Sequence, residues 1–328
     1  MAAKKSAKQR KKPKQERGIF AGLLRGCFIL SILCIVAVGA IYYFASFETR
    51  ERMDGYAKQT LNKFREAESM PNLLVGILDT LYDTVPSSEG LIVDGGELGR
   101  DNGPFLAGIP QTRIPVRLLH NTAYVSLFNE VDNQPICVAF KLIDENHATN
   151  TSPASGTSDP RVPSLQLSDL QSSNWQATPL APPRALANTY SDKGGYEAML
   201  LTNFVPIKQG LANTLWQDAM TEVAIRYPKR FDEVWIYAGP AYHKQRKQLS
   251  SGVPLPDALY VIAFDLTDSG GLRAIAFWIP TNATNGTKLS NCITSIAYIQ
   301  NQTGIQFLPE LGFDSKDLLQ NWVSPTLW

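Results

Sequence analysis

Histidine and cysteine are scarce in this chain, which has three His and four Cys among 328 residues. No group of these residues has the spacing of a zinc site. The sequence also lacks a glycine-rich phosphate loop, a Gly-x-Ser-x-Gly elbow and a His-Glu-x-x-His pair. The sequence signatures of phosphate-binding loops, nucleophile-elbow hydrolases and zinc metalloproteases are therefore absent.

The cysteines divide evenly between two parts of the chain. Cys27 and Cys34 lie in an uncharged stretch near the N-terminus, whereas Cys137 and Cys292 lie far downstream in separate apolar segments. The latter two could form a disulfide in an oxidising compartment. Because cysteine is often buried as a free thiol, two separately buried thiols are the alternative interpretation.

Positive charge is concentrated at the N-terminus. Residues 1–25 contain nine Lys or Arg and one acid, Glu16, and we expect them to form a basic cytoplasmic tail. The whole chain has 31 basic and 30 acidic residues, so the remainder keeps 22 basic and 29 acidic residues, a formal net charge of about −7. Sequence-independent nucleic-acid binding requires Lys and Arg to neutralise phosphates, and this acidic balance opposes it.

An uncharged, apolar stretch follows the basic tail. Residues 26–47 contain no charged side chain and are long enough to cross a bilayer. A cleaved signal peptide is the competing interpretation, but its apolar region is normally shorter and ends in small residues rather than bulky aromatics. The sequence therefore predicts a single transmembrane helix that anchors the chain to the membrane, with the N-terminus in the cytoplasm and the large C-terminal part outside it.

The rest of the chain is predicted to be a stalk and linker over residues 48–109 and a compact domain over residues 110–328. Charged residues mixed with spaced apolar ones favour helix in the first part of the linker, and Gly and Pro mark an irregular stretch after it. In the domain, apolar runs predict strands over residues 122–128, 135–142, 231–238, 258–264 and 272–279, and helices over 209–226 and 289–303. This mixture indicates an α+β fold that opens with a β-hairpin.

One segment carries most of the information about function. Residues 169–182 read Asp-Leu-Gln-Ser-Ser-Asn-Trp-Gln-Ala-Thr-Pro-Leu-Ala-Pro, which resembles a signature that runs roughly Asp-Tyr, two residues, Ser-Gly-Tyr-Asp-Arg-Gly-His-Leu-Ala-Pro. That signature belongs to the DNA/RNA non-specific endonucleases of the ββα-metal group. Further similar elements are Asp159-Pro160-Arg161, Thr202-Asn203-Phe204-Val205-Pro206 and Val234-Trp235-Ile236-Tyr237-Ala238-Gly239-Pro240. The resemblance implies a ββα-metal nuclease-like domain built on antiparallel β-sheet with flanking helices, here preceded by a transmembrane helix.

The resemblance also implies where the family's catalytic groups would lie. Its Asp-Arg-Gly-His positions are occupied by Gln176, Ala177, Thr178 and Pro179. In the family the histidine is the general base, and a proline cannot take a proton. The family's metal-binding asparagine and supporting glutamate align with Ala212 and Met220, and a glutamine is replaced by Ile207. We therefore expect no bound cofactor.

Neighbouring residues provide a fallback site. Asn213 or Asp218 could bind a metal ion, with His120, His147 or His243 as base. A shift of one residue along a helix rotates the side chain by about 100°, so Asn213 should point away from the direction of Ala212.

Two hypotheses follow. In the first, the domain is an inactive relative of the family that binds or scaffolds an unknown protein or polymer partner. In the alternative, it is an active endonuclease that hydrolyses DNA or RNA phosphodiesters with Mg²⁺ at a relocated site, and nucleic acid is its partner.

Overall fold

The computed structural model describes residues 91–96, 98, 103–145, 147, 155–243, 245–267, 269–284 and 286–328. The predicted basic tail, the transmembrane helix at residues 26–47 and the linker up to residue 90 lie outside these described residues. Within the described ranges, no helix combines the length and the apolar character needed to cross a bilayer.

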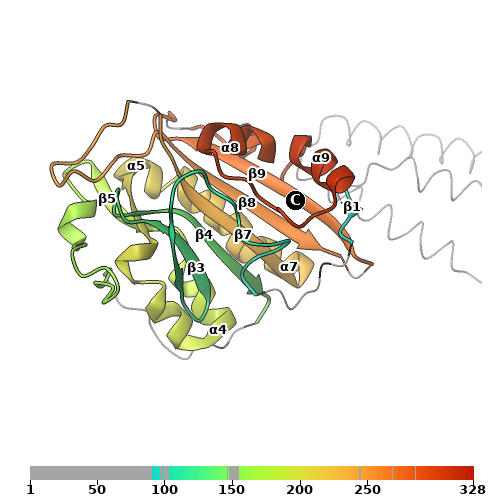
Figure 1. The fold of residues 1–328 in the computed structure, drawn as a ribbon, viewed down its shortest axis with the longest axis horizontal. Coiled ribbons are helices and arrows are strands. Elements are labelled where there is room, and N and C mark those ends of the chain that lie inside the picture. The colour runs from blue at the N-terminus through green and yellow to red at the C-terminus, as the bar shows by residue number, and fades with distance from the viewer. Residues whose placement is uncertain are drawn as a thin grey trace, which may run out of the picture. The chain divides into compact units, whose positions relative to one another are not determined.

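One antiparallel sheet forms the centre of the domain, with strands in the order β1, β9, β8, β7, β4, β3, β2, and with β10 also paired to β9 (Figure 1). The strands are β1 (Val93–Asp94), β2 (Arg117–His120), β3 (Tyr124–Asn129), β4 (Gln134–Ile143), β7 (Glu233–Ala241), β8 (Ala258–Leu266), β9 (Gly271–Pro280) and β10 (Ile293–Thr294). A second, two-stranded sheet consists of β5 (Trp175–Pro179) and β6 (Phe204–Lys208). The α+β architecture expected from the sequence is confirmed.

The central strands are apolar on both faces because helices cover both sides of the main sheet. In β8, alternate residues such as Val261 enter the core on one face, and those such as Ile262 enter the core on the other. Since neither face meets water, β8 is buried along its whole length. This explains why its residues 258–264 are a continuous apolar run, before Asp265, rather than an alternation of polar and apolar residues.

Helices pack on each face of the main sheet (Figure 1). The first face carries α4 (Pro183–Glu197), α5 (Gln209–Ala212), α6 (Leu215–Thr221), the π-helical turn η3 (Glu222–Arg226) and α7 (Tyr227–Phe231). The second carries α8 (Ile296–Thr303) and α9 (Phe313–Asn321). Short 3₁₀ turns are η1 (Leu167–Leu170), η2 (Leu201–Asn203) and η4 (Leu289–Cys292).

The predicted opening hairpin is present as β3 and β4. Its turn is held by the side chain of Asn129, which accepts a hydrogen bond from the backbone N–H of Val131 at 3.0 Å and donates one to Asp132 at 2.7 Å. Asx residues favour turns because they form such local bonds. The acidic residues of this turn therefore have a structural role.

The predicted helices are shorter or broken in the structure. The helix expected over residues 209–226 is interrupted after Ala212, because Thr214 has φ −128° and ψ −100°, and it resumes at Leu215. The helix expected over residues 289–303 is divided into η4, β10 and α8. Ser295 caps α8 by accepting a hydrogen bond from Tyr298 N at 3.1 Å, so the helix starts there.

The domain begins earlier than the predicted boundary at residue 110. Strand β1 pairs with β9, and Leu106 is completely buried. The hydroxyl of Tyr237 fastens this segment, since it accepts from Leu106 N at 2.7 Å and donates to Leu106 O at 3.0 Å. In the described part of residues 91–109, glycines such as Gly103 and Gly108, together with Pro104, break regular structure, and for this reason the sequence pattern resembles a linker.

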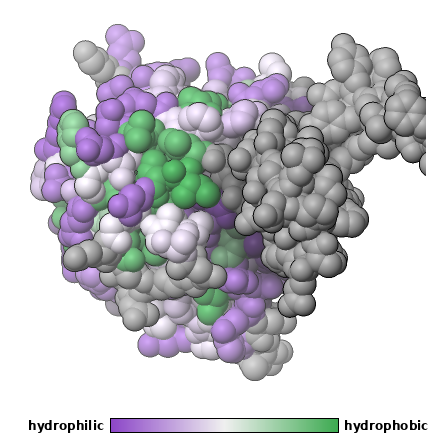
Figure 2. All heavy atoms as spheres, turned by 90° about the vertical axis from the view of Figure 1, so that its right-hand side faces the viewer, coloured by the Kyte–Doolittle hydropathy of each residue, from purple (hydrophilic) through white to green (hydrophobic). Residues whose placement is uncertain are grey.

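Helix α9 divides its apolar residues between the core and the surface. Leu319 is buried, whereas Phe313 and Leu318 are exposed, as are Trp322 and Val323 just after the helix. Figure 2, in which the right-hand side of Figure 1 faces the viewer, shows apolar residues gathered on one part of that face. Contiguous exposed apolar surface is uncommon away from contact sites.

Candidate functional site

The motif residues lie in a β-hairpin-like pair followed by a helix. Gln176, Ala177, Thr178 and Pro179 lie on β5 and pair with Ile207, Pro206, Val205 and Phe204 of β6, respectively. Helix α5 follows β6 directly and contacts both strands. The two strands and the helix reproduce the ββα arrangement that the resemblance implied.

No side chain on the motif strand offers a base. Pro179 is a half-buried pyrrolidine ring without a titratable group, and Thr178 is buried with its hydroxyl donating to Gln176 O at 3.3 Å. A neutral hydroxyl is too weak a base to take a proton from water near neutral pH. The hydrogen bonds of β5 are therefore those of a structural strand.

The positions that the resemblance aligns with the family's metal-binding residues are apolar. Ala212 and Ile207 are buried in the core cluster between the main sheet and helices α4 to α7, and Met220 packs against the same cluster. Magnesium prefers oxygen ligands from carboxylates, carbonyls and water. A methyl group and a thioether do not fit that requirement, so the residues at these positions do not form a magnesium site.

The fallback ligands point to the surface. Asn213 and Asp218 are exposed, whereas Ala212 is buried, in agreement with the rotation expected between adjacent helical residues. Asp218 lines a hollow of about 490 Å³ together with Lys208. Within the described part of the chain, no three His, Cys, Asp or Glu side chains are grouped closely enough to hold a metal ion.

The side chain of Asn203 forms structural hydrogen bonds with the backbone. Its side-chain oxygen accepts from Ala181 N at 2.9 Å, and its amide donates to Ala181 O at 2.9 Å and Ala198 O at 2.7 Å. The residue has no exposed surface. It ties the segment after β5 to the end of α4 and the start of β6, and no oxygen remains free for a metal ion.

The Asp-x-Arg element forms a second polar cluster. The guanidinium of Arg161 bonds both carboxylate oxygens of Asp159, with the shortest distance 2.7 Å, and Thr202 donates to Asp159 at 2.6 Å. Burial of Asp159 favours its protonated form, but the hydrogen bonds from Arg161 and Thr202 outweigh it and lower the pKa of the carboxyl group. Arg161 also donates to His120 O at 2.8 Å and to Asn121 at 2.8 Å, so this cluster links β2 to η2.

The three histidines are dispersed. His120 ends β2, His147 lies in a loop where it contacts Glu145, and His243 follows β7 and lines a hollow beside Asp257. All three are exposed. The structure therefore does not bring two of them together on the ββα motif.

The two downstream cysteines are free thiols in separate cores. Cys137 lies in the core under α8 and α9, and Cys292 lies in the core on the other face of the main sheet. Burial raises the pKa of Cys137 to about 12 and also raises that of Cys292. The alternative of two separately buried thiols is the one found, because the sheet lies between them.

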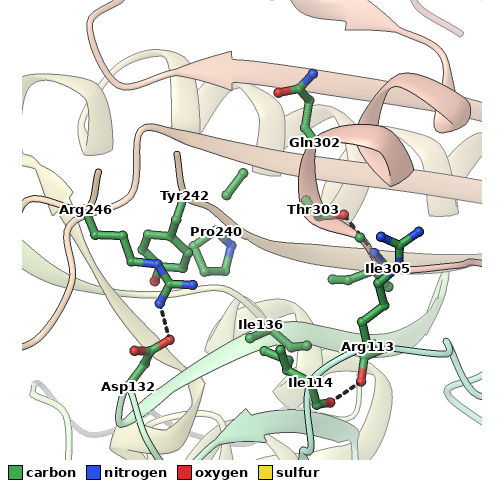
Figure 3. Close-up of a pocket in the computed structure, with 13 residues that line it drawn as sticks. Arg113, Ile114, Asp132, Ile136, Pro240, Tyr242, Arg246, Gln302, Thr303 and Ile305 are labelled. Atoms are coloured by element: carbon green, nitrogen blue, oxygen red, sulfur yellow. Dashed lines mark hydrogen bonds and ion pairs between the residues drawn. The ribbon is translucent and has the colours of Figure 1, made fainter. Parts of the chain in front are cut away.

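A pocket of about 290 Å³ lies away from the motif, between the end of β7, the β3–β4 turn and α8 (Figure 3). Arg246 pairs with Asp132 on one side of it, with 2.5 Å between Nη1 and Oδ2, and Arg113 lies on the opposite side. The carboxylate of Asp132 is thus occupied by Arg246 and by Asn129. This pocket contains no free acid or base that could serve the motif strand.

Comparison with known proteins decides the family. A model of the DNA/RNA non-specific endonuclease family matches residues 105–313. The chain belongs to this family. A solved structure of EndoG in complex with EndoGI, described as revealing the mechanism of EndoG inhibition, is 19% identical, has a TM-score of 0.55, and matches over 63% of this chain and 90% of that chain. No curated protein matches the sequence.

The sequence did not indicate which exposed residues of this endonuclease-family domain come together. Trp175 pairs with Lys208 across β5 and β6, and both line one hollow with His243, Lys247 and Asp257. Strand register brings residues 175 and 208 together, and the packing of the small sheet beside the main sheet adds the others. Only the aromatic residue in a polar context, Trp175, could have suggested a binding role from sequence.

Proposed function

We propose that this domain is a catalytically inactive member of the DNA/RNA non-specific endonuclease family that acts in binding or scaffolding. The observation that carries the proposal is the replacement of both reacting groups, with Pro179 at the base position and Ala212 at the metal position. Attack on a phosphodiester needs a proton acceptor for water and a cation for the developing charge. Ala212 and Ile207 lie in an apolar core, which adds support.

A plasmid-nicking assay tests this proposal. The purified chain is incubated with supercoiled DNA and with RNA in the presence of Mg²⁺ or Mn²⁺, and we expect no cleavage. The double variant Pro179→His and Ala212→Asn provides the comparison, because it restores the family residues at both positions. Reproducible metal-dependent nicking by the unaltered chain, stopped by chelation, would overturn the proposal.

The alternative function is a metal-dependent endonuclease with a relocated site. The observation in its favour is Asp218, an exposed carboxylate that lines a hollow of about 490 Å³ with Lys208. If this alternative holds, Asp218→Ala or Asn213→Ala removes Mg²⁺ binding and nicking. If both variants keep Mg²⁺ binding and nicking, the alternative has no metal site among these residues.

The proposal places the domain outside the cytoplasm on a single-pass anchor. It rests on the uncharged residues 26–47 and on the basic residues that precede them. Proteolysis of intact cells or spheroplasts should remove the C-terminal domain and leave an N-terminal tag protected. Release of the domain into the soluble fraction without protease would contradict the anchor.

A further inference from the structure

Two neighbouring hollows, one of them lined by residues of β5 and β6, lie on this domain, and this inference rests on the binding role proposed above. The first, of about 330 Å³, is lined by Trp175, Lys208 and Trp278 among others. The second, of about 410 Å³, is lined by Trp278, Asn291 and Tyr298 among others. Trp278, Pro280 and Asn282 line both, so the two hollows adjoin, and together they are called the groove below. The catalytic position Pro179 is at the other end of β5 from Trp175.

Aromatic rings are spaced along this groove. Trp175 is half-buried at one end, with the ammonium of Lys208 5.9 Å from its ring centre. Trp278 is half-buried in the middle, and its ring meets that of exposed Tyr298 edge to face at 5.3 Å between centroids. Partly exposed rings of this kind offer apolar faces for stacking.

Uncharged hydrogen-bonding groups line the same groove as the rings. The side chains of Asn282 and Asn291 are exposed and have no hydrogen-bond partner among the residues that the structure describes. The indole N–H groups of Trp175 and Trp278 likewise have none there. Each amide offers two donors and an acceptor. The groove therefore combines apolar faces with free neutral donors and acceptors.

The groove has little charge for binding a polyanion. Lys208 and Lys247 are its lysines within the described residues, and Asp257 offsets one of them. Non-specific nucleic-acid binding rests on Lys and Arg that neutralise several phosphates. The domain that carries the groove also belongs to the acidic part of the chain. A neutral polymer suits this surface better than nucleic acid.

We propose that this groove binds a neutral polysaccharide. A pyranose ring has an apolar C–H face that stacks on an indole and a rim of hydroxyls that pair with amides. Trp175 and Trp278 provide faces for successive sugar units, and Asn282 lies where the hollows join, within reach of the hydroxyl rims. Two adjoining hollows suit a chain of sugar units rather than a single small molecule.

Binding to an array of neutral oligosaccharides of the glucan, mannan and chitin types tests the proposal. The full chain is applied in mild detergent, with heparin and single-stranded DNA on the same array, and the tightest neutral ligand is then titrated by tryptophan fluorescence. We expect saturable binding to at least one neutral hexasaccharide. Trp175→Ala and Asn282→Ala should each weaken it at least tenfold.

Trp322→Ala is the matched control, because Trp322 is a partly exposed tryptophan after α9, remote from the groove in sequence and absent from its lining. Circular dichroism and unfolding midpoints establish that each variant is folded, and Asn282 has no structural bond to lose. Absence of binding to every neutral glycan overturns the inference, as does binding only to DNA or heparin, or equal affinity of Trp175→Ala and the unaltered chain. These binding results do not depend on DNA cleavage. The glycan inference can therefore fail while the nicking assay still supports the proposed lack of nuclease activity.

Discussion

Replacement of Asn203 by alanine should destabilise the domain strongly, because its side chain is a structural connector. The substitution removes three buried hydrogen bonds, of 2.9, 2.9 and 2.7 Å. A buried hydrogen bond contributes about 1 kcal/mol net, and the unpaired backbone groups of Ala181 and Ala198 add a desolvation cost. We expect a loss of about 3–5 kcal/mol in the free energy of unfolding, a large fraction of the stability of a typical domain.

Urea denaturation followed by intrinsic fluorescence measures this loss as a shift in the midpoint at constant slope. Asn213→Ala is the control, since Asn213 is an exposed asparagine at the end of α5 in the same part of the fold. Its substitution should change the free energy of unfolding by less than about 0.5 kcal/mol. If Asn203→Ala costs no more than Asn213→Ala, the structural role assigned to Asn203 is wrong.

Three further predictions concern acid stability, thiol reactivity and the domain boundary. The pKa of Asp159 is lower in the folded state than in the unfolded state. The contribution of its ionised carboxylate to the free energy of unfolding is therefore complete above the unfolded-state pKa and is lost as the pH falls through the folded-state pKa. Urea denaturation from pH 6 to pH 3 should therefore show a smaller decrease in the free energy of unfolding for Asp159→Asn than for the unaltered chain. In a Cys27→Ser, Cys34→Ser background, a thiol reagent at pH 8 should label Cys137 only after the domain unfolds, because burial raises the pKa of this thiol to about 12. Rapid labelling of Cys137 in the native state would contradict its burial. Tyr237→Phe should lower the free energy of unfolding by about 1–3 kcal/mol, as it removes two hydrogen bonds to Leu106; a change below about 0.3 kcal/mol in chemical denaturation would mean that residues 103–109 are not fastened there.

The main strands could be predicted because their side chains follow simple rules. Buried strands such as β8 contain long apolar runs, here residues 258–264, and turn residues such as Asn129 mark strand ends. Helix ends were less predictable, since the break at Thr214 depends on how α5 packs against β5 and β6. The segment before residue 110 resembles a linker in sequence because irregular backbone carries its buried Leu106, and a tyrosine distant in sequence, Tyr237, holds that backbone in place.

The sequence by itself indicated the family and the α+β class, and the resemblance aligned Pro179, which offers no proton acceptor, and Ala212, which offers no oxygen ligand, with the family's base and metal ligand. These follow from residue identity and order, which need no coordinates. Only the tertiary structure decided that Asn203 is a structural connector, that Cys137 and Cys292 lie on opposite faces of a sheet, and that Trp175 and Trp278 line one groove. Such contacts join residues far apart in the chain, so they depend on strand register and on the packing of helices and sheets, which a linear pattern does not specify.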